Sequence, residues 1–309
     1  MKRLLLHICM LMTMSIFAGC AKFETEPLPA DDAIAFSADI TRATTSSLGI
    51  GDEFDIWGSM TKYGTTGPIL SQERVYNTSG SWQYDKTAYW FDAATYSFRA
   101  LHPHNIPNVA FVTTSSSPYI TITNFDATKN TDLLIAKRDN IMYLKANNPS
   151  TTVGLTFSHM LSRLEFEGKS NIPGTIIDIK SVKLFGLATT ASYNEQTNTW
   201  TMGSSLTTAT NPNAQAAAST ITSLGSTLMT DVTVVPQTIG DSIILSITYT
   251  DDTGEKTINS KLSEADLSAW EAGKSYRYTF TIQPNQNIVF NKPQIIGWEH
   301  ATGGIIVVD

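Results

Sequence analysis

Basic charge is scarce in this chain of 309 residues. Lysine and arginine together number 21, against 28 aspartates and glutamates, and the formal net charge is −7. Proteins that bind phosphate backbones concentrate lysine and arginine on one surface, and no such cluster occurs along this sequence. We therefore expect no nucleic-acid partner.

Long hydrophobic runs are also missing, apart from one short run near the amino terminus. An almost unbroken apolar stretch covers residues 4–17 and follows Lys2 and Arg3. A helix needs about twenty apolar residues to cross a bilayer, so this stretch is too short for a retained span. A basic start, an apolar centre and small residues before Cys20 are typical of an export signal. We expect residues 1–19 to be removed.

Cysteine is nearly absent. Cys9 lies inside the expected signal, and Cys20 follows Phe17-Ala18-Gly19 in an order similar to the bacterial lipoprotein box. We predict that Cys20 carries acyl chains such as palmitate and anchors the mature protein to a membrane, because each buried methylene contributes about 0.8 kcal/mol. A plainly secreted protein is the alternative. No disulfide remains available in either case, so buried apolar surface must stabilise the fold.

Helical periodicity is missing before Thr131, and short alternating runs separated by turn formers take its place. Apolar side chains alternate with small or polar ones from Ile34 to Ala38. Similar runs predict strands over residues 54–57, 96–100, 119–123, 153–161, 243–249 and 276–282. The apolar positions change parity between Leu161 and Leu164, which requires a bulge or bend there.

These runs predict an all-β fold of two β-sandwich domains in series. Removal of the signal leaves 290 residues, which is long for one domain. The turn formers at residues 147–150 mark the expected junction. We expect a tether and first strand at residues 20–42, one domain at 43–148 and a second at 149–309. Ser263 is expected to start a short helix, Gly67 and Pro68 to lie in a loop, and residues 194–219 to form a surface connection.

Catalytic and metal-binding constellations are missing as well. His102 and His104 are two residues apart, but Pro103 between them favours a loop, and no cysteine or acid stands nearby to complete a metal site. His159 lies in an alternating run and is interpreted as a hydrogen-bonded core residue. We expect no catalytic residue, no metal and no cofactor, and hence no enzyme.

Three segments carry a resemblance to a known family. They are IAFSADITRA at residues 34–43, LTFSHMLSRLEF at 155–166 and WEAGKSYRY at 270–278. In this order, behind a lipoprotein signal, they resemble the fimbrillins, the type V pilins of anaerobic Gram-negative bacteria. The resemblance covers essentially the whole chain. It implies two transthyretin-like β-sandwich domains, lipoprotein delivery to the outer membrane, assembly with other fimbrial subunits, and adhesion.

The resemblance also implies proteolytic processing. In similar fimbrillins an arginine-specific protease removes the tether and the first strand. Arg42 precedes Ala43 and a polar stretch of the kind that proteases reach easily, so we predict cleavage between these two residues. A surface arginine without a processing role is the alternative.

Removal of the first strand would expose unpaired backbone groups that require a replacement strand. Strongly β-forming residues follow Gly303-Gly304 near the end of the sequence, namely Ile305, Ile306, Val307 and Val308. We predict that they add in trans to the groove of a neighbouring subunit by β-augmentation. Alternatively, they form an ordinary last strand of their own domain.

A second function remains open at the sequence level. A monomeric surface lipoprotein could bind a host protein or glycan through exposed aromatic side chains. The candidates are Trp82, Tyr84, Tyr89 and Trp90. We interpret these four as core residues, because aromatic side chains contribute large buried areas.

Overall fold

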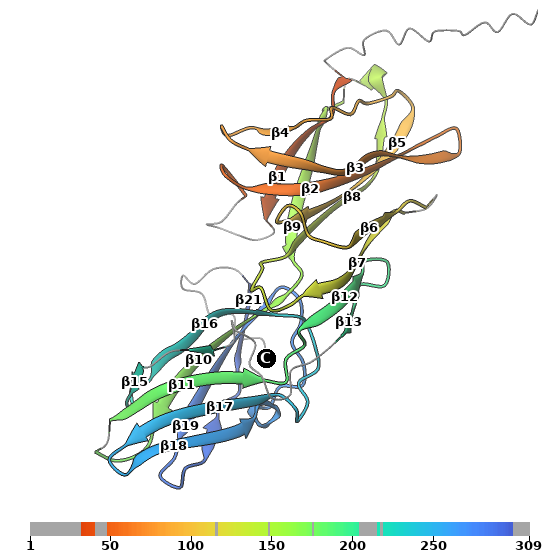
Figure 1. Ribbon diagram of the computed structural model, residues 1–309. Coiled ribbons are helices and arrows are strands. Elements are labelled where there is room, and N and C mark those ends of the chain that lie inside the picture. Colours follow the sequence, from red (N-terminus) through yellow and green to blue (C-terminus); the bar gives the residue numbers. More distant parts are fainter. Residues whose placement is uncertain are drawn as a thin grey trace, which may run out of the picture.

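The computed structural model describes residues 32–40, 48–114, 117–147, 149–174, 176–203, 215–216 and 219–298. Strands and short 3-10 helices make up its regular structure, and this part of the chain contains no α-helix. Within these residues, no helix is long and apolar enough to cross a membrane. Figure 1 shows an elongated molecule built of several sheets. The prediction of an all-β, sandwich-like fold is confirmed.

The first sheet has seven strands in the order β1-β9-β8-β5-β2-β3-β4. They are β1 (Ala35–Ile40), β2 (Glu53–Lys62), β3 (Thr65–Asn77), β4 (Trp82–Tyr84), β5 (Ala94–His102), β8 (Leu134–Tyr143) and β9 (Thr152–His159). The two edges meet, because the Tyr84 hydroxyl on β4 donates a hydrogen bond of 2.7 Å to the Ile34 carbonyl before β1. The sheet thus curls around a core that includes the fully buried Phe54, Phe98 and Phe157.

A second sheet covers part of the outer face of the first. Its order is β13-β12-β7-β6, with β6 (Val109–Val112), β7 (Tyr119–Asp126), β12 (Thr190–Asn194) and β13 (Thr199–Met202). Trp57 and Leu101 of the first sheet share a core with Ile120 and Ile122 of the second. Because β12 and β13 come late in the chain, this sheet combines strands from both halves of the sequence.

Two five-stranded sheets form a sandwich at the other end of the molecule (Figure 1). One contains β10 (Ser162–Ser170), β16 (Ser226–Val234), β19 (Lys274–Ile282), β20 (Ile288–Phe290) and β21 (Gln294–Gly297). The other contains β11 (Ile177–Phe185), β14 (Gln215–Ala216), β15 (Ser219–Ile221), β17 (Ile244–Asp251) and β18 (Gly254–Lys261). The predicted faces meet in the core between them, with Leu245 and Tyr249 opposite Tyr278 and Phe280.

The predicted bend after β9 is confirmed. β9 pairs with β8 and β1 in the first sheet, whereas β10 pairs with β16 and β19 in the sandwich. The apolar parity changes because the chain leaves one sheet for another at Met160 and Leu161. A domain junction at residue 148 would separate β9 from the sheet that contains it. Phe157 packs in the core of the first sheet, whereas Leu164 packs in the core of the sandwich, so the chain passes from one core to the other between these two residues. The division into two domains remains a prediction.

Three local predictions were wrong. Gly67 and Pro68 lie within β3 instead of a loop. At these residues β3 pairs with β2 on one side only, and the structure describes no strand on the other side. Proline, which has no backbone N–H to donate, is tolerated at such an open edge. Ser263 does not cap a helix, because its hydroxyl donates to Asp241 and the helix is a single 3-10 turn, Leu262–Ala265. Residues 199–202 form β13 instead of part of a loop.

Candidate functional site: the first strand and its groove

β1 occupies one edge of the first sheet and runs parallel to β9. The register pairs Ala35 with Thr152 and continues to the pair of Ile40 with Phe157. Ile34, Phe36 and Ile40 are buried, while Ala35, Ser37 and Asp39 are exposed. The alternation predicted from the sequence therefore places one face of this strand in the core of the first sheet.

Aromatic contacts hold the centre of β1. The ring of Phe36 packs edge-on against Tyr84 and Phe98, with centroid distances of 5.3 and 5.7 Å. Burial raises the pKa of Tyr84, whose hydroxyl also accepts a hydrogen bond from the Ala88 amide. We call the surface that β1 covers, formed by the edge of β9, Tyr84 and Phe98, the β1 groove.

A charged contact fixes the start of the segment. The Asp32 carboxylate accepts hydrogen bonds from Lys145 Nζ at 2.6 Å and from the Tyr143 hydroxyl at 3.1 Å. The hydrogen bond from Lys145 lowers the pKa of Asp32 below its ordinary value. We call these two contacts the Asp32 clasp. The Asp32 carbonyl also accepts from the Trp90 amide at 2.8 Å, so that side chain and backbone are both held.

The predicted processing and assembly residues lie outside the described residues. These are Cys20, Arg42, Ala43, Ile305, Ile306, Val307 and Val308. The structure shows what flanks them. The described part of the chain ends at Ile40 and resumes at Leu48. The Leu48 side chain is 7% exposed and packs in the core that β1 covers. Before residues 305–308, the last described residue is Trp298. Its ring stacks on the ring of His159, with 4.4 Å between the ring centroids.

The predicted role of His159 is confirmed. Its Nδ1 lies 2.8 Å from an Asp132 carboxylate oxygen, and its side chain is 10% exposed. Trp298 covers one face of the ring and donates its backbone N–H to the Gly273 carbonyl. His159 thus helps to hold Trp298, the last residue that the structure describes.

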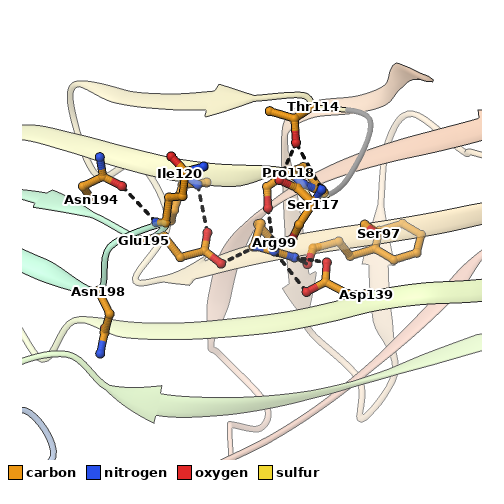
Figure 2. Close-up of polar contacts among 12 residues, drawn as sticks. Ser97, Arg99, Thr114, Ser117, Pro118, Ile120, Asp139, Asn194, Glu195 and Asn198 are labelled. Atoms are coloured by element: carbon orange, nitrogen blue, oxygen red, sulfur yellow. Dashed lines mark hydrogen bonds and ion pairs between the residues drawn. The ribbon is translucent and has the colours of Figure 1, made fainter. Parts of the chain in front are cut away.

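A buried ion cluster joins the first sheet to the second, and the sequence analysis missed it. Arg99 on β5 is 2% exposed and forms ion pairs with Asp139 at 2.7 Å and Glu195 at 2.5 Å. Figure 2 shows its guanidinium between these two carboxylates, with the Pro118 carbonyl as a further acceptor. Burial raises the pKa of Glu195, and the positive charge of Arg99 opposes that shift. An arginine within the alternating run 96–100 was the only sequence signal.

The other candidate residues take structural positions. The Nδ1 atoms of His102 and His104 lie 2.8 Å from the Glu53 carbonyl and 2.6 Å from an Asp55 carboxylate oxygen. In the described ranges, no three His, Cys, Asp or Glu side chains are grouped as metal ligands. Trp90 is 3% exposed, as the core interpretation predicts. Trp82 and Tyr84 are half-buried against the same core.

Comparison with known proteins places the chain in a family. The model of the fimbrillin-like family matches residues 41–298, so the chain belongs to the fimbrillin-like family. No match was found among curated proteins. A fimbrial protein from Bacteroides vulgatus is 18% identical, with a TM-score of 0.60 over 86% of this chain and 99% of that one. A candidate cell adhesion protein from Bacteroides uniformis is 20% identical, with a TM-score of 0.53 over 88% and 100%.

These similarities establish the fold and the general class of the protein. The family is that of the fimbrillin-like proteins, and the two similar solved structures are a fimbrial protein and a candidate cell adhesion protein. At these identities the solved structures support the fold alone. The role of the β1 groove therefore has to be argued from this chain.

Proposed function

We propose that this protein is a structural or adhesive subunit of a surface fimbria, exported as an outer-membrane lipoprotein through Cys20. Cleavage between Arg42 and Ala43 releases the tether together with β1. Residues 305–308 of a neighbouring subunit then occupy the β1 groove. Repetition of this exchange links the subunits into a polymer.

The observation that carries this proposal is the position of β1. It is an edge strand, and the amino-terminal segment reaches the rest of the chain through the stretch between Ile40 and Leu48, which contains Arg42. One cut there frees the segment covalently without breaking any other described strand. Its loss would leave the edge of β9 unpaired and the apolar pocket of Phe36 open to water, which favours a replacement strand.

Amino-terminal sequencing of the surface-assembled protein tests the processing step. The proposal predicts a sequence that starts at Ala43, and an Arg42→Ala variant that stays unprocessed and outside fimbriae. An assembled form that begins at Cys20 would contradict cleavage. Incorporation of labelled palmitate that is lost in a Cys20→Ala variant tests the anchor separately.

The alternative of a monomeric receptor for a host glycan or protein receives less support. It relied on an exposed group of aromatic side chains, and Trp90 and Tyr84 instead hold β1 and its surroundings through hydrogen bonds. An adhesive contact with a host partner remains compatible with the fimbrial role.

A further inference from the structure

We propose that a cleft between the second sheet and the sandwich binds a neutral sugar residue of a glycan. The cleft has a volume of about 530 Å³, within the range of about 300–1,000 Å³ that is typical of small-ligand sites. It lies apart from the β1 groove, because no residue of β1 lines it. The proposal adds a class of ligand to the adhesive role and depends on neither cleavage at Arg42 nor polymer formation.

The cleft has two walls that come from different sheets. The end of β9 and the hairpin of β12 and β13 form one wall. The loops after β16 and before β19 form the other, which we call the sandwich wall. Figure 1 shows the second sheet between the first sheet and the sandwich. A ligand in this cleft would therefore contact both halves of the molecule.

The two loops of the sandwich wall are tied to each other. The Ile239 N–H donates to the Ser268 carbonyl at 2.8 Å. The Trp270 N–H donates to the Gln237 carbonyl at 2.9 Å, and the Trp270 indole N–H donates to the Tyr278 hydroxyl at 2.8 Å. This wall is therefore in place before a ligand arrives, which reduces the entropy cost of binding.

Aromatic rings line the opposite wall. Tyr193 and Trp200 pair across the hairpin of β12 and β13, with ring centroids 5.1 Å apart. Phe125 supports the Trp200 ring at 5.7 Å, yet Trp200 remains only half-buried. A sugar ring carries C–H groups on its faces, and their positive charge favours the negative face of an aromatic ring. Trp200 thus supplies a platform for the apolar face of a sugar.

Polar side chains on both walls suit the hydroxyl groups of a sugar. The Tyr193 hydroxyl donates to Asn198 Oδ1 at 3.0 Å, which leaves the Asn198 N–H groups as donors. His159 Nδ1 lies 2.8 Å from an Asp132 carboxylate oxygen, which leaves Nε2 as an acceptor in the neutral ring. Glu271 is exposed at the cleft and adds carboxylate acceptors. Sugar hydroxyls donate and accept at once, as this mixed set requires.

Gln237 provides an independent sign of a missing partner. Its side chain lines the cleft, and its Nε2 atom is buried without a hydrogen-bond partner in the described part of the chain. A buried donor without a partner costs free energy and calls for an explanation. Rotation of the amide about its last bond presents this N–H to a ligand hydroxyl. Binding would then satisfy a group that the protein alone leaves unpaired.

The charge of the lining selects among ligand classes. Among the described residues of the two walls there is no lysine or arginine, whereas Glu271 contributes an acid. Phosphate, sulfate and acidic sugars would therefore lack a counter-charge. A wholly apolar ligand would remove water from Asn198, Gln237 and Glu271 without replacing their hydrogen bonds, which is costly. A neutral ligand with many hydroxyl groups fits best.

Saturation-transfer NMR on the uncleaved mature chain tests the class of ligand. The probes are the methyl glycosides of glucose, galactose, mannose and N-acetylglucosamine. At least one should bind with a Kd of about 1 mM, as expected for a ligand of this size, and N-acetylneuraminic acid should bind more weakly. A preference for N-acetylneuraminic acid would overturn the neutral class. Binding of a decaproline peptide but of no glycoside would replace the sugar by a polypeptide and overturn the proposal.

Replacing Gln237 with methionine separates binding from folding. Gln237→Met keeps the shape of the side chain and removes the unpaired N–H, so the free energy of unfolding in urea should stay unchanged or rise, while the Kd should increase about tenfold. The matched control is Gln83→Met, because Gln83 is exposed on β4 and does not line the cleft. A destabilised Gln237→Met variant that binds like the parent chain would assign Gln237 a structural role and overturn its part in the site.

Two further variants locate the site. Ala272 is exposed and lines the cleft, so Ala272→Arg should block it, whereas Ala110→Arg, at an exposed position of β6 outside the cleft, should bind like the parent chain. Trp200→Leu should weaken binding about tenfold through loss of the aromatic face. Unchanged binding by Ala272→Arg would overturn the location. Polymers should form as before in the Ala272→Arg variant, so failure of this proposal is distinguishable from failure of the fimbrial role.

Discussion

Replacing Phe36 with alanine tests how firmly β1 is held in its groove. The side chain is 5% exposed and packs edge-on against Tyr84 and Phe98. Removal of a buried phenylalanine side chain costs about 3–5 kcal/mol, and we expect the lower part of that range because an edge strand can relax. Since 1.4 kcal/mol corresponds to a factor of ten, a cleaved β1 segment should be retained about 100- to 1,000-fold less tightly.

Two measurements give this quantity. Urea unfolding of the uncleaved variant should show a free energy of unfolding about 3 kcal/mol below that of the parent chain. Release of β1 after cleavage between Arg42 and Leu48 can be followed by mass spectrometry. Ser37→Ala is the matched control, because Ser37 lies on the exposed face of the same strand. A loss below about 1 kcal/mol, or an equal loss in the control, would refute the view that Phe36 anchors the strand.

Further substitutions test the charged contacts. Asp32→Asn should speed release of the cleaved β1 at pH 7. The hydrogen bond from Lys145 lowers the pKa of Asp32 below 3.8, so its stabilisation is fully present above that pH and is lost progressively as the pH falls through the lowered pKa. The effect of the substitution on release rates should therefore shrink as the pH is lowered below 3.8. Arg99→Met should lower the free energy of unfolding, measured in urea, by about 3–5 kcal/mol, because Glu195 then stays buried without its partner. Adding Glu195→Gln should restore part of this loss. If the effects of the two substitutions were simply additive, the pairing of Arg99 with Glu195 would be contradicted. A hydrogen bond from Lys256 lowers the pKa of Asp251 to about 2, so its stabilisation is lost as the pH falls from 3.8 to about 2. Asp251→Asn should therefore remove the fall in melting temperature over this pH range. A melting temperature that depends on pH in the same way in the variant would contradict this cause.

Local alternation predicted the strands that define the site. The apolar face of residues 34–40, the strand at 96–100 and the opposed faces of β17 and β19 all follow from period-two patterns. The change in parity of the apolar positions after Leu161 also correctly indicated that the chain leaves its sheet there. Such features depend on neighbouring residues, and a single sequence contains that information.

The pairing of strands that are distant in the sequence could not be predicted from local alternation. Nothing near Glu195 in the sequence shows that it lies beside Arg99, because their contact depends on the pairing of β12 with β7, which are distant in the chain. Pro68 was read as a loop because proline usually ends strands, but the open edge of β3 tolerates it. The Asp32 clasp was missed because it also joins distant segments: Lys145 reaches Asp32 only after β9 has paired with both β8 and β1.

Assembly of the cleaved chain measures the central claim most directly. Purified protein is compared by analytical ultracentrifugation and negative-stain microscopy in four forms, cleaved or uncleaved between Arg42 and Leu48, each with and without residues 305–309. The account predicts polymers only from the cleaved chain that keeps these residues, with folded monomers from the other three forms. Polymers from the uncleaved chain, or from the cleaved chain without residues 305–309, would contradict it.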